Sequence, residues 1–311
     1  MSNIPARVQV TEVGTRDGFQ AEPKFIPTET KVRVINDLVG AGVPRLEYSS
    51  FMSPRAVPQL ADSAQVLQGV DRSATMMGLI ANAKGARRGV DAGVDELVVV
   101  ISASESHNRK NVNRSVDESL DGFEEVALIA GDANVPVHGA IATAFGCPFE
   151  GEVPFEQIGY IADRFEKLGF HGIGLGDTTG MATPPLVTGL CRYLRDRFPQ
   201  TPVALHFHNT RGIGLCNVMA GLDEGIDRFE SSIGGLGGCP FAPGATGNIC
   251  TEDLVYLLHE MGIETGIDLD RLCEVARYVE EVVEHRLPGQ VMKAGTRTRL
   301  HDLDEARTAT G

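Results

Sequence analysis

Short apolar segments alternate with longer amphipathic segments along most of the chain. Most of the short segments are rich in β-branched or other apolar residues and are too short for helices, which is typical of strands buried in a parallel sheet. Eight strands are predicted, over Val8–Val13, Arg45–Ser49, Thr75–Ile80, Glu96–Ile101, Pro136–Thr143, Gly172–Gly176, Pro202–His208 and Arg228–Ser232. Helices are predicted between them over Glu29–Ala41, Ala83–Ala92, Val116–Ala130, Phe155–Leu168, Pro185–Arg197 and Gly214–Glu224.

The eightfold repeat of strand and helix favours a closed α/β barrel of the TIM (β/α)8 type. Glycines such as Gly93 and Gly169 follow the predicted helices, where glycine provides a left-handed cap before the next strand. An open, doubly wound sheet is the alternative, but no GxGxxG motif follows the first strand. We expect a barrel domain over residues 1–267, a C-terminal helical extension over 268–299 that contains the helical pattern Asp268–His285, and a flexible tail over 300–311.

Charge and cysteine usage narrow the class of protein. The chain carries 28 Lys and Arg against 42 Asp and Glu, a net charge of -14, and such an acidic surface repels nucleic acid. No apolar run approaches the roughly 18 residues of a membrane span, and no targeting segment is visible, so we expect no membrane partner. The cysteines lack CxxC spacing, which predicts reduced thiols in a cytoplasmic protein; they stand at positions 147, 191, 216, 239, 250 and 273.

Two histidines give the sharpest chemical signal. His206 and His208 are two residues apart on a predicted strand, so both imidazoles can face the mouth of the barrel. This pairing is better explained by metal binding than by two hydrogen-bonded core histidines. Asp17 and Asn248 offer a carboxylate and an amide oxygen at the same carboxyl ends of strands, and a mixed set of nitrogen and oxygen ligands suits Mg²⁺, Mn²⁺ or Co²⁺.

Two neighbouring features each allow two interpretations from spacing alone. Arg16, beside Asp17, either forms a structural ion pair at the barrel rim or holds an anionic oxygen. The glycine-rich segment Gly234–Asn248 is either a long flexible loop or a mobile lid that brings Cys239 over the site. Cys147, which follows the fifth strand, is the competing thiol.

These motifs resemble those of the 3-hydroxy-3-methylglutaryl-coenzyme A lyase family, which belongs to the metal-dependent lyase and synthase barrels. The similarity runs from Val10 to about Ile267 and includes EVGTRDGFQ at 12–20, EYSSFMSP at 47–54, GCPFEG at 146–151, GDT at 176–178, HFH at 206–208 and GLGGCPFAPGATGN at 235–248. The RDG and HxH motifs are shared across these barrels. The GLGGCP segment is much narrower and indicates the lyase branch.

The resemblance implies a role for each matching residue. The implied metal ligands are Asp17, His206, His208 and Asn248, and the implied catalytic residues are Arg16 and Cys239, supported by Glu47 and Asp177. The sequence departs from the family at Asn209, where an aspartate is common, and at Phe207, where a cysteine is common. An amide cannot replace a carboxylate base at position 209, and Phe207 is expected to point away from the site.

The implied reaction is the cleavage of 3-hydroxy-3-methylglutaryl-CoA to acetyl-CoA and acetoacetate with a divalent cation, Mg²⁺ or Mn²⁺. Asp177, Glu47 and a metal-bound water are all candidates for the base that deprotonates the hydroxyl. An acidic protein needs a local basic patch for the phosphates of CoA, and we expect contacts from Asn82, Lys84, Lys110 and Asn111 beside other basic residues of the 107–114 segment. The alternative interpretation of these residues is a solvated loop where a helix begins.

Other functions remain open at this level. The closest alternatives keep the chemistry and change the acyl group, to citramalyl-CoA or a longer 3-hydroxy-3-alkylglutaryl-CoA. A condensing 2-alkylmalate synthase is disfavoured because its usual C-terminal region is absent, and a non-catalytic CoA-binding barrel is disfavoured by the complete set of site residues. A homodimer is expected by analogy with other barrels of this kind.

Overall fold

The computed structural model describes residues 4–237 and 247–300 of the 311-residue chain. In this part of the chain eight parallel strands close into a barrel in sequence order, and β8 pairs with β1. The strands are β1 Gln9–Glu12, β2 Arg45–Ser50, β3 Thr75–Ile80, β4 Glu96–Ser102, β5 Val137–Ala142, β6 Gly172–Asp177, β7 Val203–Phe207 and β8 Arg228–Ser231. The predicted TIM barrel is confirmed.

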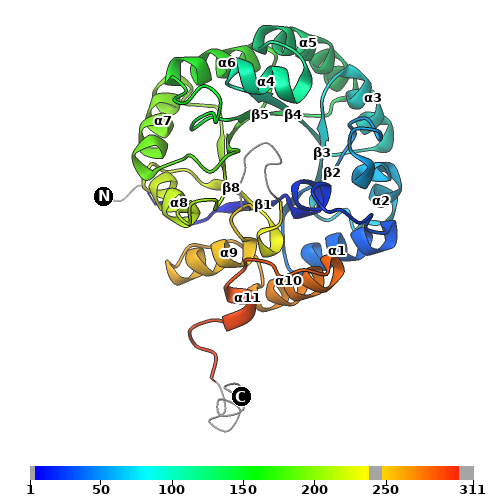
Figure 1. Cartoon of the computed structure of the whole chain (residues 1–311), viewed down its shortest axis with the longest axis vertical. Coiled ribbons are helices and arrows are strands. Elements are labelled where there is room, and N and C mark those ends of the chain that lie inside the picture. The colour runs from blue at the N-terminus through cyan, green and yellow to red at the C-terminus, as the bar shows by residue number, and fades with distance from the viewer. Residues whose placement is uncertain (1–3, 238–246, 301–311) are drawn as a thin grey trace.

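Helices surround the barrel on all sides (Figure 1). They are α1 Thr28–Gly40, α2 Ser63–Gly69, α3 Ala83–Ala92, α4 Glu105–Val112, α5 Val116–Ala133, α6 Phe155–Lys167, α7 Pro184–Arg197, α8 Gly214–Asp223, α9 Thr251–Glu260, α10 Leu269–Val283 and α11 Val291–Ala294, with short turns η1 Gly14–Gly18, η2 Pro58–Leu60 and η3 Ile233–Gly235. None of them, within the described ranges, has the length and apolar content that a bilayer span requires.

Every predicted strand agrees with an observed strand to within one residue at each end. The sequence interpretation missed α2, α4 and α9, which follow β2, β4 and β8. α2 has only seven residues and α4 is strongly polar, so neither shows a long apolar stripe. The helical segment expected at the C-terminus is present as α10, which begins where Asp268 accepts hydrogen bonds from the backbone N–H groups of Asp270 and Arg271.

Strand register determines which side chains face the interior of the barrel. Side chains alternate along a strand, and residues paired in register lie on the same face of the sheet. Glu47 pairs with Met77, and His206 pairs with Glu230. Met77, Leu79 and Val98 form a small apolar cluster separate from the main core. Charged and imidazole side chains therefore share the barrel interior with this small cluster, and the main apolar core includes residues of the surrounding helices.

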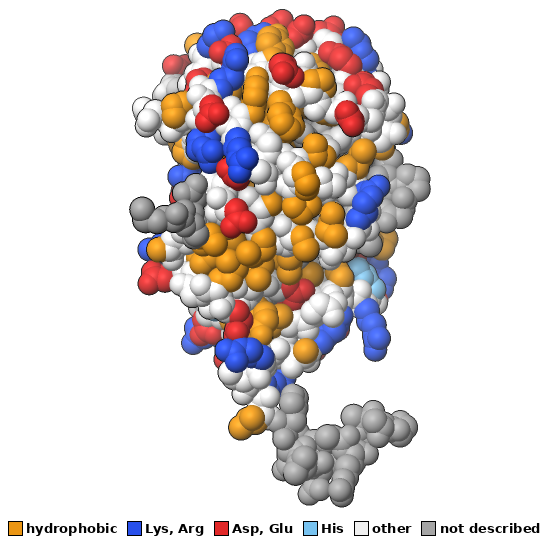
Figure 2. Space-filling model, turned by 90° about the vertical axis from the view of Figure 1, so that its left-hand side faces the viewer, with side chains coloured by type: hydrophobic (Ala, Val, Ile, Leu, Met, Phe, Trp, Pro, Cys, Tyr) orange, Lys and Arg blue, Asp and Glu red, His pale blue; other side chains and the backbone are white. Residues whose placement is uncertain are grey.

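The outer surface mixes charged and apolar side chains. Figure 2 shows the side of the molecule that lies on the left in Figure 1, where α7 is found. Apolar side chains gather there between charged ones, and Leu186 of α7 is 38% exposed.

Candidate active site and metal centre

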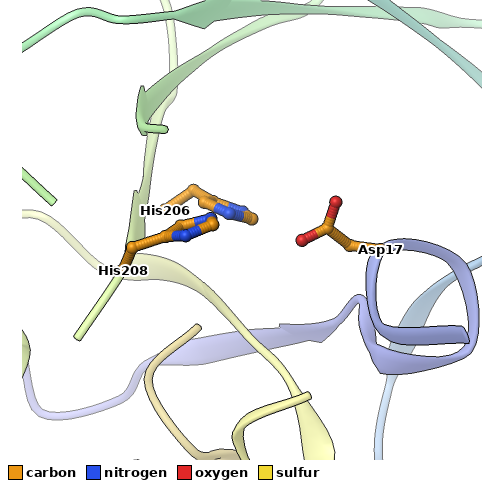
Figure 3. A group of neighbouring side chains, drawn as sticks. All are labelled: Asp17, His206 and His208. Atoms are coloured by element: carbon orange, nitrogen blue, oxygen red, sulfur yellow. The ribbon is translucent and has the colours of Figure 1, made fainter. Parts of the chain in front are cut away.

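Asp17, His206 and His208 come together at the carboxyl ends of β1 and β7. One ligand atom from each of the three lies within 4.8 Å of the other two. The two imidazoles lie next to each other, with ring centroids 5.3 Å apart, and both extend toward the Asp17 carboxylate (Figure 3). Strand alternation predicts that the two imidazoles share one side, and Asp17 is expected nearby from its place just after β1. His208 lies one residue beyond β7, where a backbone bridge pairs it with Asn248.

A tight turn directly after β1 places Asp17. The chain makes one π-helical turn over Gly14–Gly18, and the N–H of Asp17 donates to the carbonyl of Val13 at 2.7 Å. The turn requires glycine at position 14, because a Cβ there would stand 2.6 Å from Oε1 of Glu12. The same oxygen accepts the N–H of Gly14 at 2.6 Å, which anchors the turn to the strand.

Asn248 contacts both Asp17 and His208. Its Nδ2 donates to Oδ2 of Asp17 and to the carbonyl of Leu236, each at 2.8 Å. Its Oδ1 is buried and accepts no hydrogen bond from the described residues. A buried acceptor without a donor costs about 1–3 kcal/mol, and a cation would satisfy it. The arrangement therefore fits a divalent ion.

The charges of the group favour an ionised carboxylate. Burial acts to raise the pKa of Asp17, but the Arg16 guanidinium, the two imidazoles and the Asn248 amide outweigh it and lower the pKa to about 2. Asp17 is thus negatively charged at neutral pH, as a metal ligand must be.

Arg16 is held between two carboxylates. Its Nη1 donates to Oδ1 of Asp17 at 2.6 Å, and its Nε donates to Oε1 of Glu47. Burial acts to lower the pKa of Arg16, but these two carboxylates raise it above its ordinary value, so the guanidinium stays charged. Burial likewise raises the pKa of Glu47 even though Arg16 opposes this effect. Of the five N–H donors of a guanidinium, two are used by these partners within the described chain.

Glu230 is a site residue that the sequence interpretation missed. Its Oε2 lies 3.0 Å from Nδ1 of His206, the residue with which it pairs in register. Burial acts to lower the pKa of His206, but the hydrogen bond and charge of Glu230 raise it above its ordinary value. A carboxylate that is hydrogen-bonded to Nδ1 fixes the orientation of the ring and leaves Nε2 as the nitrogen that can bind a metal. Only the pairing of β7 with β8 could have revealed this contact.

Asp177 ends β6 and is buried next to this site. Its Oδ1 accepts the backbone N–H groups of Met181 and Ala182 at 2.6 and 2.8 Å, and its Oδ2 is buried without a hydrogen bond from the described residues. Burial raises the pKa of Asp177 to about 7. Asp177 does not belong to the three-residue metal group.

The predicted thiol, Cys239, lies outside the described residues. The described chain reaches the site just before it, at Gly237, where an added Cβ would stand 2.7 Å from Nδ2 of Asn248 and 3.0 Å from Oδ2 of Asp17. The competing thiol, Cys147, is buried, and its Sγ donates to Oγ of Ser104 at 2.9 Å.

Of the four residues expected to contact CoA, two line one hollow and two lie on α4. Asn82 and Lys84 line a hollow of about 320 Å³ at the ends of β2 and β3, although the Asn82 side chain also caps α3 by accepting the N–H of Gly85. Lys110 and Asn111 are exposed on α4, and Nζ of Lys110 lies 4.6 Å from the centroid of the Phe149 ring.

The positions that depart from the family pattern have structural explanations. Phe207 is fully buried and points into the core, where its ring centroid lies 5.7 Å from that of Phe145. Oδ1 of Asn209 accepts the N–H of Gly214, the first residue of α8. Both side chains therefore have structural contacts of their own.

A closed barrel with a metal-binding group at the carboxyl ends of its strands is the architecture of a barrel enzyme. The model of the HMGL-like family matches residues 7–279. A hydroxymethylglutaryl-CoA lyase of Bacillus subtilis is 42% identical over 288 residues, which cover 92% of this chain and 96% of that protein. The mitochondrial hydroxymethylglutaryl-CoA lyase of Gallus gallus is 39% identical over 296 residues, which cover 94% and 99%.

A solved structure agrees with these relatives. It is an HMG-CoA lyase from Acinetobacter baumannii in complex with coenzyme A and 3-methylmalate, 44% identical with a TM-score of 0.91, covering 96% of this chain and 98% of that one. The chain therefore belongs to the HMGL-like family. The resemblance to hydroxymethylglutaryl-CoA lyases that the sequence predicts is confirmed.

Proposed function

We propose that this protein cleaves 3-hydroxy-3-methylglutaryl-CoA to acetyl-CoA and acetoacetate. The observation that carries the proposal is the joint placement of Asp17, His206 and His208 with the fixed guanidinium of Arg16 at one end of the barrel. In the reaction the 3-hydroxyl loses its proton, the C2–C3 bond breaks, and acetoacetate leaves. The bond electrons remain on the thioester fragment as an enolate, which takes up one proton to become acetyl-CoA.

The metal is a divalent cation, Mg²⁺ or Mn²⁺, held by Asp17, His206, His208 and Asn248. Oxygen donors from a carboxylate and an amide beside two imidazoles suit these ions. When bound, the cation supplies Lewis acidity that lowers the pKa of a hydroxyl in contact with it. The protein's own contribution is to keep Asp17 ionised and to keep the amide oxygen of Asn248 buried without a hydrogen-bond donor from the described residues.

Arg16 stabilises the negative charge that develops on the thioester oxygen, because its remaining N–H donors are directed by two bound carboxylates before substrate arrives. Glu47 acts through Arg16 and positions it. Asp177 accepts the proton of the hydroxyl: one oxygen is fixed by two backbone N–H groups, and burial raises its pKa to about 7, where a base works best at neutral pH. An Asp177→Asn variant should lose kcat without a change in metal binding.

Cys239 protonates the enolate. The last described residue before it, Gly237, lies so near the site that an added Cβ would stand 2.7 Å from Nδ2 of Asn248 and 3.0 Å from Oδ2 of Asp17. The acyl-CoA itself is contacted by Asn82 and Lys84 in the hollow beside α3 and by Lys110 and Asn111 on α4. Lys84→Ala and Lys110→Ala should each raise KM for the thioester with little change in kcat.

The test is the release of acetyl-CoA by purified protein with Mg²⁺, comparing 3-hydroxy-3-methylglutaryl-CoA with citramalyl-CoA. Chelator-treated protein and a Cys239→Ala variant serve as controls. Preference for the first substrate, lost in both controls, is the expected result. Preference for citramalyl-CoA would contradict the proposed substrate while keeping the chemistry, and release that survives chelation would contradict the metal.

We also propose that the protein works in the cytoplasm as a homodimer. The cysteines of the described chain are free thiols, and the apolar side chains that gather on the face drawn in Figure 2 form a surface for a second copy. Sedimentation of the purified chain at twice its 33.3 kDa mass would support the dimer, and a monomer at micromolar concentration would contradict it.

A further inference from the structure

A second group of side chains that could hold a metal ion lies at the opposite, amino-terminal ends of the strands. Glu96 begins β4, His138 is the second residue of β5, and His171 directly precedes β6. One ligand atom from each lies within 4.8 Å of the other two. Among the described residues only this group and the Asp17 group meet that condition, and the function proposed above does not use it.

The hydrogen bond that His171 makes through Nδ1 leaves Nε2 available to a cation. Its Nδ1 lies 2.8 Å from the carbonyl oxygen of Val137. A carbonyl only accepts, so Nδ1 carries the proton, and Nε2 is the atom that faces Oε1 of Glu96 at 3.3 Å. Two such atoms at this separation need either a second proton or a metal ion between them. A histidine that donates its other N–H to a backbone carbonyl is the usual arrangement of a metal ligand.

Glu96 is held in the same way. Its Oε2 accepts Nη2 of Arg45 at 2.6 Å, and the side chain is 3% exposed. The carboxylate therefore keeps its orientation and presents Oε1 to the two imidazoles. A ligand carboxylate fixed by a hydrogen bond to its second oxygen is again the arrangement that supports a metal site.

The barrel makes room for the third imidazole. His138 is 6% exposed, and its ring lies against the glycines of β6: a Cβ would stand 2.8 Å from its Nδ1 at Gly172 and 3.0 Å from its Nε2 at Gly174. Its Nε2 is buried and has no hydrogen-bond partner in the described chain. An imidazole enclosed in this way, beside a carboxylate and a second imidazole, is poorly satisfied by protein groups alone.

We propose that Glu96, His138 and His171 bind a Zn²⁺ ion at the amino-terminal end of the barrel. Two imidazoles and one carboxylate form a ligand set that holds zinc with a fourth position open to water. His171 is 36% exposed and gives the ion a path from solvent. The ion would join the beginnings of three consecutive strands, so its effect falls on the stability of the barrel, whereas the chemistry takes place at the other end.

Zinc stoichiometry tests the site separately from the active centre. Chelator-treated protein is equilibrated with Zn²⁺, freed of excess metal, and analysed for zinc per chain by mass spectrometry. We expect two ions in the wild type, one in a His206→Ala/His208→Ala variant, one in His171→Ala, and none in the triple variant. In the His206→Ala/His208→Ala variant, added Zn²⁺ should raise Tm, and His171→Ala should abolish that rise.

His285→Ala is the matched control, because His285 also pairs with a glutamate, Glu22, at 3.1 Å but belongs to no metal group of the described chain. It should retain both ions. Zinc soaked into wild-type crystals should give an anomalous peak among Glu96, His138 and His171, a result that does not depend on any variant folding. Absence of that peak, or unchanged zinc in His171→Ala, would overturn the proposal.

Discussion

Replacing Glu230 by glutamine should weaken metal binding at the Asp17 group by about tenfold. Oε2 of Glu230 lies 3.0 Å from Nδ1 of His206, and the two side chains are only 11% and 13% exposed. A hydrogen bond to a charged group contributes about 1.5–3 kcal/mol, against about 1 kcal/mol for a neutral one. The substitution therefore removes roughly 0.5–2 kcal/mol of support from a ligand, which corresponds to about 2- to 30-fold in affinity.

The size of the loss should depend on pH. Glu230 raises the pKa of His206 despite its burial, so in the wild type protons compete with the metal for this ring. The variant releases that proton more easily. The difference in affinity should therefore be largest at high pH, where no proton competes, and shrink as the pH falls.

The assay is a titration of chelator-treated protein with Mn²⁺, with free Mn²⁺ followed by electron paramagnetic resonance. Glu22→Gln is the matched control, since it neutralises a carboxylate that also pairs with a histidine, His285, 3.1 Å away. It should bind Mn²⁺ as the wild type does. If Glu230→Gln also binds with unchanged affinity at high pH, Glu230 does not support the ligand and the reasoning is refuted.

Three further results are expected. Gly237→Ala should lower the affinity for Mn²⁺ about tenfold or more, because φ at this position is +97° and the added Cβ would crowd Asn248 and Asp17. Gly262→Ala is the control: φ there is +73°, the space around it is open, and the variant should bind Mn²⁺ as the wild type does. Arg16→Lys should lower kcat/KM for acetyl-CoA release by about 100-fold or more, because lysine has a single nitrogen in place of the planar fork that donates to Glu47 from Nε and to Asp17 from Nη1 while further N–H groups remain for an oxyanion. Burial raises the pKa of Glu252 from 4.5 to about 8, so the folded chain holds a proton that the unfolded chain releases, and stability falls as pH rises through this window. Glu252→Gln should make the fall of Tm between pH 5 and 8.5 less steep, and a slope as steep as the wild type's would contradict the assignment; Glu12 and Asp177, whose pKa values burial also raises, account for the slope that remains.

The fold could be predicted because each part of it has a local cause. Buried strands are short apolar segments, and left-handed glycines such as Gly93 and Gly169 close the helices before them. α9 begins at Thr251, three residues after the glycine-rich segment Gly234–Asn248, so its start is not separated from that segment by a strand. α2 and α4 are short or polar and depend on packing against the barrel.

The site was predictable where one strand carries the information. His206 and His208 follow from alternation along β7, and Asp17 follows from its place just after β1. Glu230 could not be assigned from the sequence, because its contact depends on the register between two strands. The buried acid Glu12 was likewise not recognised: burial raises its pKa to about 7, yet three groups distant in the sequence or across a turn donate to it, and only the folded chain brings them together.

The central claim is that a cation held by Asp17, His206 and His208 is required for cleavage of the thioester. The most direct test follows bound Mn²⁺ and acetyl-CoA release in the same samples as the ion is added to chelator-treated protein. The rate of release should rise in proportion to occupancy, and Asp17→Asn should reduce both together. Full release of acetyl-CoA by metal-free protein, or release that is independent of occupancy, would contradict the account.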